Sequence, residues 1–190
     1  MTERERAKYI KILKKKLSKF RLYHSECVSK EAVRLAEKYR VDVEKAELAG
    51  LLHDIMKDVS GKDQLEVMKK CSVDVDDMLE KTPKLWHSYA GAAYVEKELG
   101  IDDEEVINAI KYHTTARAGM TRLEKVIYIA DFTSADRDYD DVDDMRRAAN
   151  KGLDDAMRYA LSYTVADLAS RGLVIHPDTF AAYNEVHAKK

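Results

Sequence analysis

The sequence predicts an all-α fold of about eight to ten helices, and three observations support this class. The 190 residues include only 7 glycines and 2 prolines, whereas all-β folds need both residues at many turns. Apolar residues recur at helical spacing along almost the whole chain, and no segment alternates with the two-residue period of a strand. With 45% hydrophobic residues the chain can bury one sizeable core, so residues 1–190 are expected to form a single domain.

Three helices are expected in the N-terminal part. Thr2 and Glu5 form a capping-box pattern at the start of the first helix. The second is expected over 20–39, where apolar residues form a stripe at helical spacing with His24 one turn before it. Asp42 is the expected N-cap of the third helix, which runs through His53.

The remaining helices are indicated by caps, prolines and glycines. Asp102 with Glu105, and Thr121 with Glu124, read as helix starts. Proline suits the first position of a helix, so His176-Pro177 is the expected start of the last one. The expected spans are 65–70, 75–81, 86–99, 105–113, 123–132, 142–149, 153–168 and 177 onward.

Composition excludes several classes of function. The 33 basic and 35 acidic residues give a net charge of −2, which argues against a nucleic-acid binder but leaves a phosphorylated small molecule open. No stretch of 18 uncharged residues and no signal-peptide pattern occurs, so no membrane partner is expected. Cys27 and Cys71 cannot build a disulfide framework, which favours the cytoplasm.

The candidate metal ligands in the sequence are histidines and aspartates. Each histidine alone is typical of an ordinary core or surface residue, although four of the six fall on or next to expected core helices. Asp131 ends the apolar run 126–130, and Asp54 lies in a second nearly uncharged window. A buried carboxylate must be paired or bound to a cation. Nitrogen and oxygen donors without thiolate favour iron, manganese, cobalt or zinc over calcium and magnesium.

The ordered set His24, His53-Asp54, His87, His113 and Asp131 resembles the signature of the HD superfamily of metal-dependent phosphohydrolases. The surrounding segments RLYHSECV, AGLLHDIMKD, WHSYAGA, IKYHTTARAGMTRLEKVIYIADF and IHPDTFAAYN are similar to the bacterial HD-type symmetrical bis(5′-nucleosyl)-tetraphosphatases. The resemblance spans nearly the whole chain. It implies a helical HD domain with core motifs at about 20–137, and C-terminal helices over 153–190 that pack on the core and contribute to the nucleotide site.

The resemblance also implies the reaction. Diadenosine tetraphosphate would be cleaved to two ADP at an iron-type centre, with a metal-bound hydroxide as the nucleophile. His24, His53, Asp54 and Asp131 would ligate the metal. His87 and His113 would contact phosphate or complete a second metal position, and either could protonate the leaving phosphate. The implied substrate contacts are Arg21, His87, His113, Asp131, Phe132, Arg137, Val174, Ile175, His176, Pro177, Asp178 and Thr179.

The spacing of the basic residues agrees with these roles. Arg21 shares a helix face with His24, so its guanidinium can reach a phosphate beside the metal. Lys57 lies four residues after His53 and completes the catalytic set with Asp54, His87 and His113, although an exposed helix lysine is an equal alternative. The free amides at the start of the helix at 176–179 favour an anion or a polar base edge.

The chain departs from the family pattern after Asp131. The family commonly has an apolar residue and then Glu-Pro before the arginine, whereas residues 133–136 here read Thr-Ser-Ala-Asp, with the spacing to Arg137 retained. Asp136, Asp138, Asp140 and Asp141 do not form a calcium loop, because glycine and glutamate are missing from the required positions. They are expected to form a solvated acidic loop that caps the helix at 142–149.

Other functions stay open at this point. The same centre would serve a nucleotidase that acts on mononucleotides, and a sensor would bind ADP or GDP without turnover. A helical interaction protein with incidental histidines is a third class. A homodimer is plausible, since closed twofold dimers are common. The sequence does not choose the metal, the number of ions or the preferred base.

Overall fold

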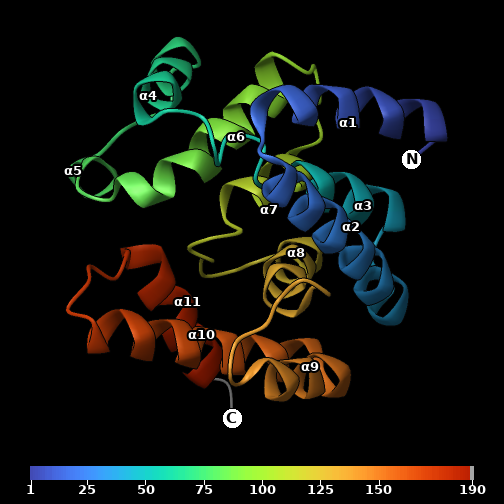
Figure 1. Cartoon of the computed structure of the whole chain (residues 1–190). Coiled ribbons are helices and arrows are strands. Elements are labelled where there is room, and N and C mark those ends of the chain that lie inside the picture. The colour runs from blue at the N-terminus through green and yellow to red at the C-terminus, as the bar shows by residue number, and fades with distance from the viewer. Residues whose placement is uncertain (189–190) are drawn as a thin grey trace.

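The computed structural model describes residues 1–188 and is all-helical over that range (Figure 1). It confirms the expected fold class, with eleven α-helices and one short 3₁₀ helix among the described residues. The helices are α1 (Glu3–Lys16), α2 (Lys19–Tyr39), α3 (Val43–Leu52), α4 (Gly61–Lys70), α5 (Asp77–Glu80), η1 (Pro83–Leu85), α6 (Trp86–Lys97), α7 (Glu104–Lys111), α8 (Arg122–Thr133), α9 (Val142–Lys151), α10 (Leu153–Ser170) and α11 (Pro177–Ala188).

The caps explain where most helices begin. Thr2 with Glu5 and Thr121 with Glu124 both form complete capping boxes, and the Asp42 side chain accepts from the amide of Lys45. These side chains satisfy amides that have no partner within the helix, so the sequence determines these starts locally.

Several expected boundaries were wrong. Asp103, not Asp102, caps α7, and its carboxylate accepts from two backbone amides. His53 follows the last residue of α3, and His113 lies two residues after the end of α7. The expected helix at 75–81 is reduced to α5. Asp141 stands at the N-cap position of α9, but its side chain makes no capping hydrogen bond.

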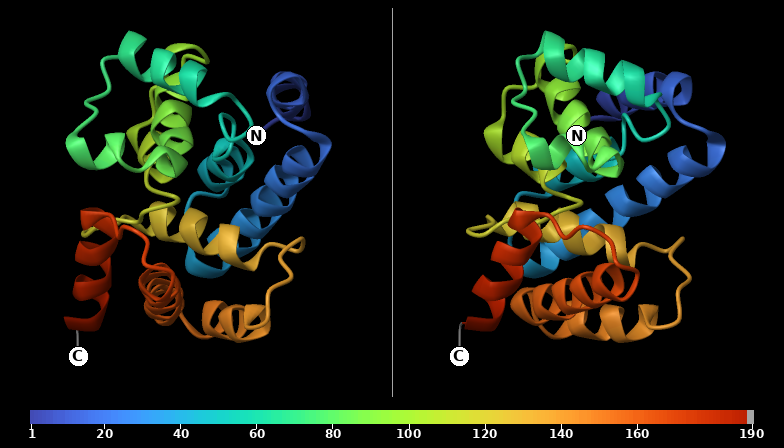
Figure 2. Two further views of the ribbon diagram at one scale, coloured as in Figure 1. Left: turned by 60° about the vertical axis from the view of Figure 1, so that its left-hand side comes forward. Right: turned by 90° about the vertical axis from the view of Figure 1, so that its left-hand side faces the viewer.

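Helix α8 lies at the centre of the fold (Figure 1). It packs against α2, α3 and α7 on one side and against α9 and α10 on the other. Its residues 126–130 are all completely buried, which fits their apolar sequence. Figure 2 shows the consequence: α1–α7 form one half of the molecule, and α9–α11 cover the other side of α8.

The contact between α2 and α3 depends on a small residue. A Cβ on Gly50 would lie 3.0 Å from Ser29 Cα and 3.1 Å from Ala32 Cβ. Glycine therefore allows these two helices to approach closely, and this approach brings His24 of α2 toward His53 at the end of α3. Among the described residues, no helix combines the length and apolar character that a membrane crossing requires.

Candidate active site

Six side chains from five parts of the chain meet beside the central helix. Five of them are at most 3% exposed, and Asp131 is largely buried. Helices α2, α6 and α8 contribute one residue each, and the segments after α3 and α7 contribute the others. The cluster comprises His24, His53, Asp54, His87, His113 and Asp131, which are the histidines and aspartates expected from the sequence.

Two overlapping groups of donor atoms form within this cluster. His24, His53 and Asp131 make one group, and His53, Asp54 and His113 make the other. Within each group the ligand atoms lie within 4.8 Å of one another. His24 Nε2 lies 3.0 Å from Asp131 Oδ1, and His113 Nε2 lies 3.5 Å from Asp54 Oδ1. His53 is shared by both groups and therefore lies at the middle of the cluster.

The hydrogen bonds of the imidazoles fix their orientation. Nδ1 of His53, His87 and His113 donates to the carbonyl oxygens of Gly50, Lys84 and Ile110, respectively, at 2.7–2.8 Å. Because carbonyl oxygens only accept, these Nδ1 atoms carry the protons and the neutral rings turn the lone pairs of Nε2 toward the cluster.

A transition-metal ion fits these donors. His24 Nε2, His53 Nε2 and Asp54 Oδ1 are buried and make no hydrogen bond among residues 1–188. The atoms that face them, such as Asp131 Oδ1 at 3.0 Å from His24 Nε2, belong to the same donor groups. Buried polar atoms without partners are costly, and a bound cation would satisfy all three. The donor set of imidazoles and carboxylates, without thiolate, suits iron, manganese, cobalt or zinc.

The protonation states agree with metal binding. Burial lowers the pKa of His53 to about 4 and holds that of His87 well below its ordinary value. Burial alone would raise the pKa of Asp54 and Asp131, but neighbouring imidazoles and the cations Lys57 and Arg137 outweigh it and hold both well below the ordinary value. At neutral pH His53 and His87 are neutral and the carboxylates of Asp54 and Asp131 are ionised, as metal ligands must be. For His24, burial alone would lower the pKa, but the carboxylates of Asp131 and Asp136 outweigh it and raise the pKa.

Three expected basic residues point into the site. Arg21 Nη1 donates to Asp54 Oδ2 at 3.3 Å, and Arg137 donates both to the Asp131 carboxylate and to its backbone oxygen. Lys57 Nζ lies 3.1 Å from His87 Nε2 and 3.9 Å from Asp54 Oδ1. The alternative of an exposed helix lysine is thus wrong for Lys57, because its ammonium faces the cluster from the turn after α3.

Asp136 corrects one expectation from the sequence. Its side chain is 6% exposed rather than solvated, and its Oδ2 lies 2.7 Å from His24 Nδ1. Ser134 Oγ donates to the other carboxylate oxygen at 2.7 Å. Asp136 therefore orients His24 from behind, as carboxylates commonly do for metal-ligating histidines. Sequence periodicity gave no signal for it, since 112 residues separate the two partners.

Thr114 is a second site residue that the sequence reasoning missed. Its hydroxyl lies 3.2 Å from His87 Nε2 and 3.0 Å from His113 Nε2, between the two imidazoles. Its position next to His113 was the available signal. The hydroxyl extends the polar surface of the cluster toward a cavity.

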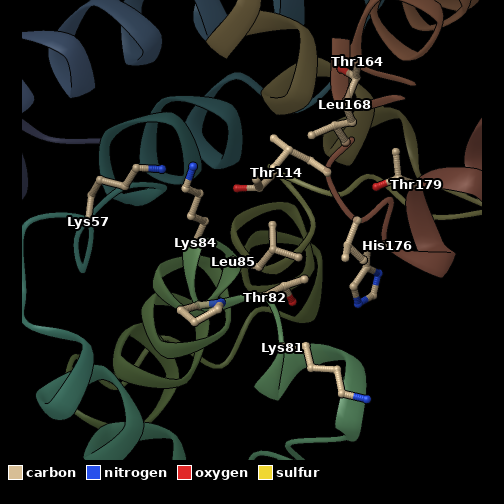
Figure 3. Close-up of a pocket in the computed structure, with 13 residues that line it drawn as sticks. Lys57, Lys81, Thr82, Lys84, Leu85, Thr114, Thr164, Leu168, His176 and Thr179 are labelled. Carbon is tan, nitrogen blue, oxygen red and sulfur yellow. The ribbon is translucent and has the colours of Figure 1, made fainter. Parts of the chain in front are cut away.

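Figure 3 shows this cavity of about 440 Å³. It is lined by Lys57 and Thr114, which contact His87 and His113 of the cluster. Lys57, Lys84 and Thr114 point toward the same end of it in Figure 3, whereas Leu168 and His176 lie toward another side. Of the expected segment 174–179, the cavity is lined by Val174, His176 and Thr179, and not by Ile175, Pro177 or Asp178. Thr179 anchors the segment by donating to the Thr115 carbonyl oxygen at 2.7 Å.

Comparison with known proteins identifies the family of this arrangement. The family model for the HD domain matches residues 21–136, which include all six residues of the cluster. This chain belongs to the HD-domain family. Over 183 residues the HD chain is 40% identical to a protein of Staphylococcus aureus named symmetrical bis(5′-nucleosyl)-tetraphosphatase, with 95% of this chain and 92% of that one covered.

Two further relatives span almost the same length. A symmetrical bis(5′-nucleosyl)-tetraphosphatase of Bacillus subtilis is 36% identical to the HD chain, over 90% of this chain and 92% of that one. A crystal structure from Clostridium acetobutylicum, described as a predicted HD superfamily hydrolase involved in NAD metabolism, superposes with a TM-score of 0.93 at 37% identity. The superposition covers 97% of each chain, so the fold of the HD chain is that of this hydrolase.

Proposed function

We propose that this HD-domain protein hydrolyses dinucleoside tetraphosphates and cleaves diadenosine tetraphosphate into two ADP. The observation that carries the proposal is the buried cluster of four histidines and two aspartates, with unpartnered Nε2 and Oδ1 atoms, surrounded by three cations. Such a centre suits hydrolysis of a polyanionic phosphate chain. The names of relatives that align over almost their whole length support this substrate class.

His24, His53, Asp54 and Asp131 hold the metal in this proposal. The bound ion supplies Lewis acidity, which activates water and polarises a phosphoryl oxygen. We infer iron as the ion, with manganese, cobalt or zinc as alternatives that the same donor set would accept. His113 belongs to the second donor group and either contacts phosphate or completes a second metal position.

The surrounding cations stabilise charge on the phosphate chain. Arg21 and Arg137 flank the two carboxylates, so their guanidinium groups lie beside any phosphate that reaches the centre. On the far side of the cluster the Lys57 ammonium lies 3.1 Å from His87 Nε2. The sequence led us to expect His87 or His113 as the proton donor to the leaving phosphate. Because burial lowers the pKa of His87, we propose that Lys57 donates this proton and that His87 positions its ammonium, while His113 stays the alternative donor.

The 440 Å³ cavity binds one nucleoside diphosphate. Its cationic end, with Lys57 and Lys84, takes the phosphates, and its apolar wall, with Leu168 and Val174, takes the nucleoside. In this proposal Val174, His176 and Thr179, with helices α10 and α11, contribute to substrate binding, and the contribution of the rest of the segment 174–179 stays a prediction. The cytoplasm is the compartment that we infer, because both cysteines are free thiols. The homodimer stays a prediction that sedimentation can test.

The proposal is tested by removing ligands while the fold is monitored. His53→Ala and Asp54→Ala are expected to lose both bound metal and turnover of diadenosine tetraphosphate, with the helical circular dichroism retained. His187→Ala is the matched control, since His187 lies exposed on α11, away from the cluster. Turnover by a metal-free double variant His53→Ala/Asp54→Ala would overturn the proposal.

A further inference from the structure

A second, smaller cavity lies at the opposite end of the histidine–aspartate cluster. It measures about 230 Å³ and is bordered by Asp131, Phe132, Arg137, Tyr139 and Tyr163. The larger cavity shares none of these residues. Two of the five, Asp131 and Arg137, belong to the centre itself, so the small cavity opens directly beside it.

Three aromatic rings form the other side of this cavity. The ring centroids of Tyr139 and Tyr163 are 5.6 Å apart, and those of Phe132 and Tyr163 are 6.5 Å apart with the rings nearly perpendicular. The Tyr139 hydroxyl donates to the Phe132 carbonyl oxygen at 3.1 Å, which holds the Tyr139 ring in place. Tyr163 is 38% exposed despite its size. A fixed and partly exposed group of aromatic rings is a surface on which flat heterocycles stack.

The two cavities lie at the two ends of one row of polar contacts. Asp131 contacts His24 and His53, His53 lies 3.7 Å from Asp54, and Asp54 lies 3.4 Å from His87. His87 contacts Lys57, which lines the larger cavity. Helix α10 contributes to both cavities through consecutive residues, Tyr163 to the small one and Thr164 to the large one. A linear ligand with one end in each cavity would have to lie along this row.

We propose that Phe132, Tyr139 and Tyr163 form the subsite for the second nucleoside of the substrate. The inference rests on the proposed function, because only a substrate with two nucleosides needs two such sites. Cleavage into two equal halves requires attack at one of the two central phosphorus atoms, so each side of the centre must hold a nucleoside diphosphate. Arg137 lies between the aromatic rings and Asp131, where it meets the diphosphate of this second half.

The test compares a substrate that has two nucleosides with one that has a single nucleoside. Tyr163→Ala is expected to raise the KM for diadenosine tetraphosphate about tenfold, the size of one lost base–aromatic contact, and to leave the KM for adenosine 5′-tetraphosphate unchanged. Tyr163→Phe keeps the ring and should behave as the wild type. Tyr94→Ala removes a partly buried ring that packs against Lys16 and lines neither of the two cavities, and it serves as the matched control.

The outcomes separate this inference from the proposed function. An equal rise in KM for both substrates, or no change in either, would overturn the subsite. If the wild type cleaves neither substrate, the proposed function fails, and the subsite is then tested by calorimetric titration of the metal-loaded protein. In that case Tyr163→Ala should weaken binding of diadenosine tetraphosphate about tenfold and leave the affinity for the first ADP, held in the larger cavity, unchanged, and an unchanged affinity for the dinucleotide would overturn the inference.

Discussion

Asp136 offers the sharpest test of how the site is organised, because it contacts His24, a proposed metal ligand, without belonging to the donor groups. Its Oδ2 lies 2.7 Å from Nδ1 of an imidazole that is 1% exposed. Asp136→Ala removes the acceptor that faces His24 Nδ1 and leaves this atom buried without that partner, while Nε2 still faces Asp131. Loss of such an outer contact typically costs about 10- to 100-fold in metal affinity, or about 1.4–2.7 kcal/mol.

The assay is anaerobic dialysis of the iron-loaded protein against increasing chelator concentrations, followed by elemental analysis. Asp136→Ala should release iron at about 10- to 100-fold lower chelator strength than the wild type. Asp136→Asn retains an acceptor oxygen and should lose less. Asp138→Ala is the control, because Asp138 is exposed in the same loop. Wild-type affinity in Asp136→Ala, with the fold intact, would refute the role of Asp136.

Three other predictions concern stability. The pKa of His53 is about 4 in the folded chain and 6.5 when free, so the unfolded state binds more protons between these values. The metal-free protein should therefore lose about 3 kcal/mol of unfolding free energy from pH 6.5 to pH 4 in urea titrations, and an equal loss in His53→Gln would contradict this. Gly50→Ala should lower the free energy of unfolding by about 1–3 kcal/mol, because the added methyl group overpacks the contact between α2 and α3. Gly91→Ala should lower it by less, because the nearest atom to its added methyl group would lie 3.6 Å away. Equal melting temperatures of the two variants would exclude the close contact at Gly50. Arg117→Ala removes the positive partner of the completely buried Glu124 carboxylate, which keeps the Thr121 backbone amide as a donor. This change should lower the free energy of unfolding by about 3 kcal/mol in denaturant titrations, and a loss below about 1 kcal/mol would show that Glu124 does not depend on this ion pair.

The sequence predicted those features that depend on neighbouring residues. The capping boxes at Thr2 and Thr121 were confirmed because each is closed by a partner three residues away. Asp102 was predicted as the cap of α7 and Asp103 occupies that position, since either of the two adjacent acids could cap the helix. His53 and His113 lie beyond their helices, where their Nδ1 atoms donate to carbonyl oxygens of the last helical turn.

In the candidate site too, the sequence predicted what is visible along the chain and missed what depends on contacts between distant segments. The six histidines and aspartates of the cluster were identified from an ordered pattern along the chain, and the structure brings them together. Asp136 and Tyr163 were missed, because their roles come from contacts between distant segments. Tyr163 reads from the sequence as an ordinary residue of an amphipathic helix, and only the packing of α8 against α10 places it at the end of the site.

The most direct test of the proposed reaction is analysis of its products. Iron-loaded protein is incubated anaerobically with diadenosine tetraphosphate, the nucleotides are separated by chromatography, and Asp131→Ala serves as the control. The account predicts two ADP for each substrate consumed and no products from the control. Formation of AMP and ATP, or an intact substrate with iron bound, would contradict it.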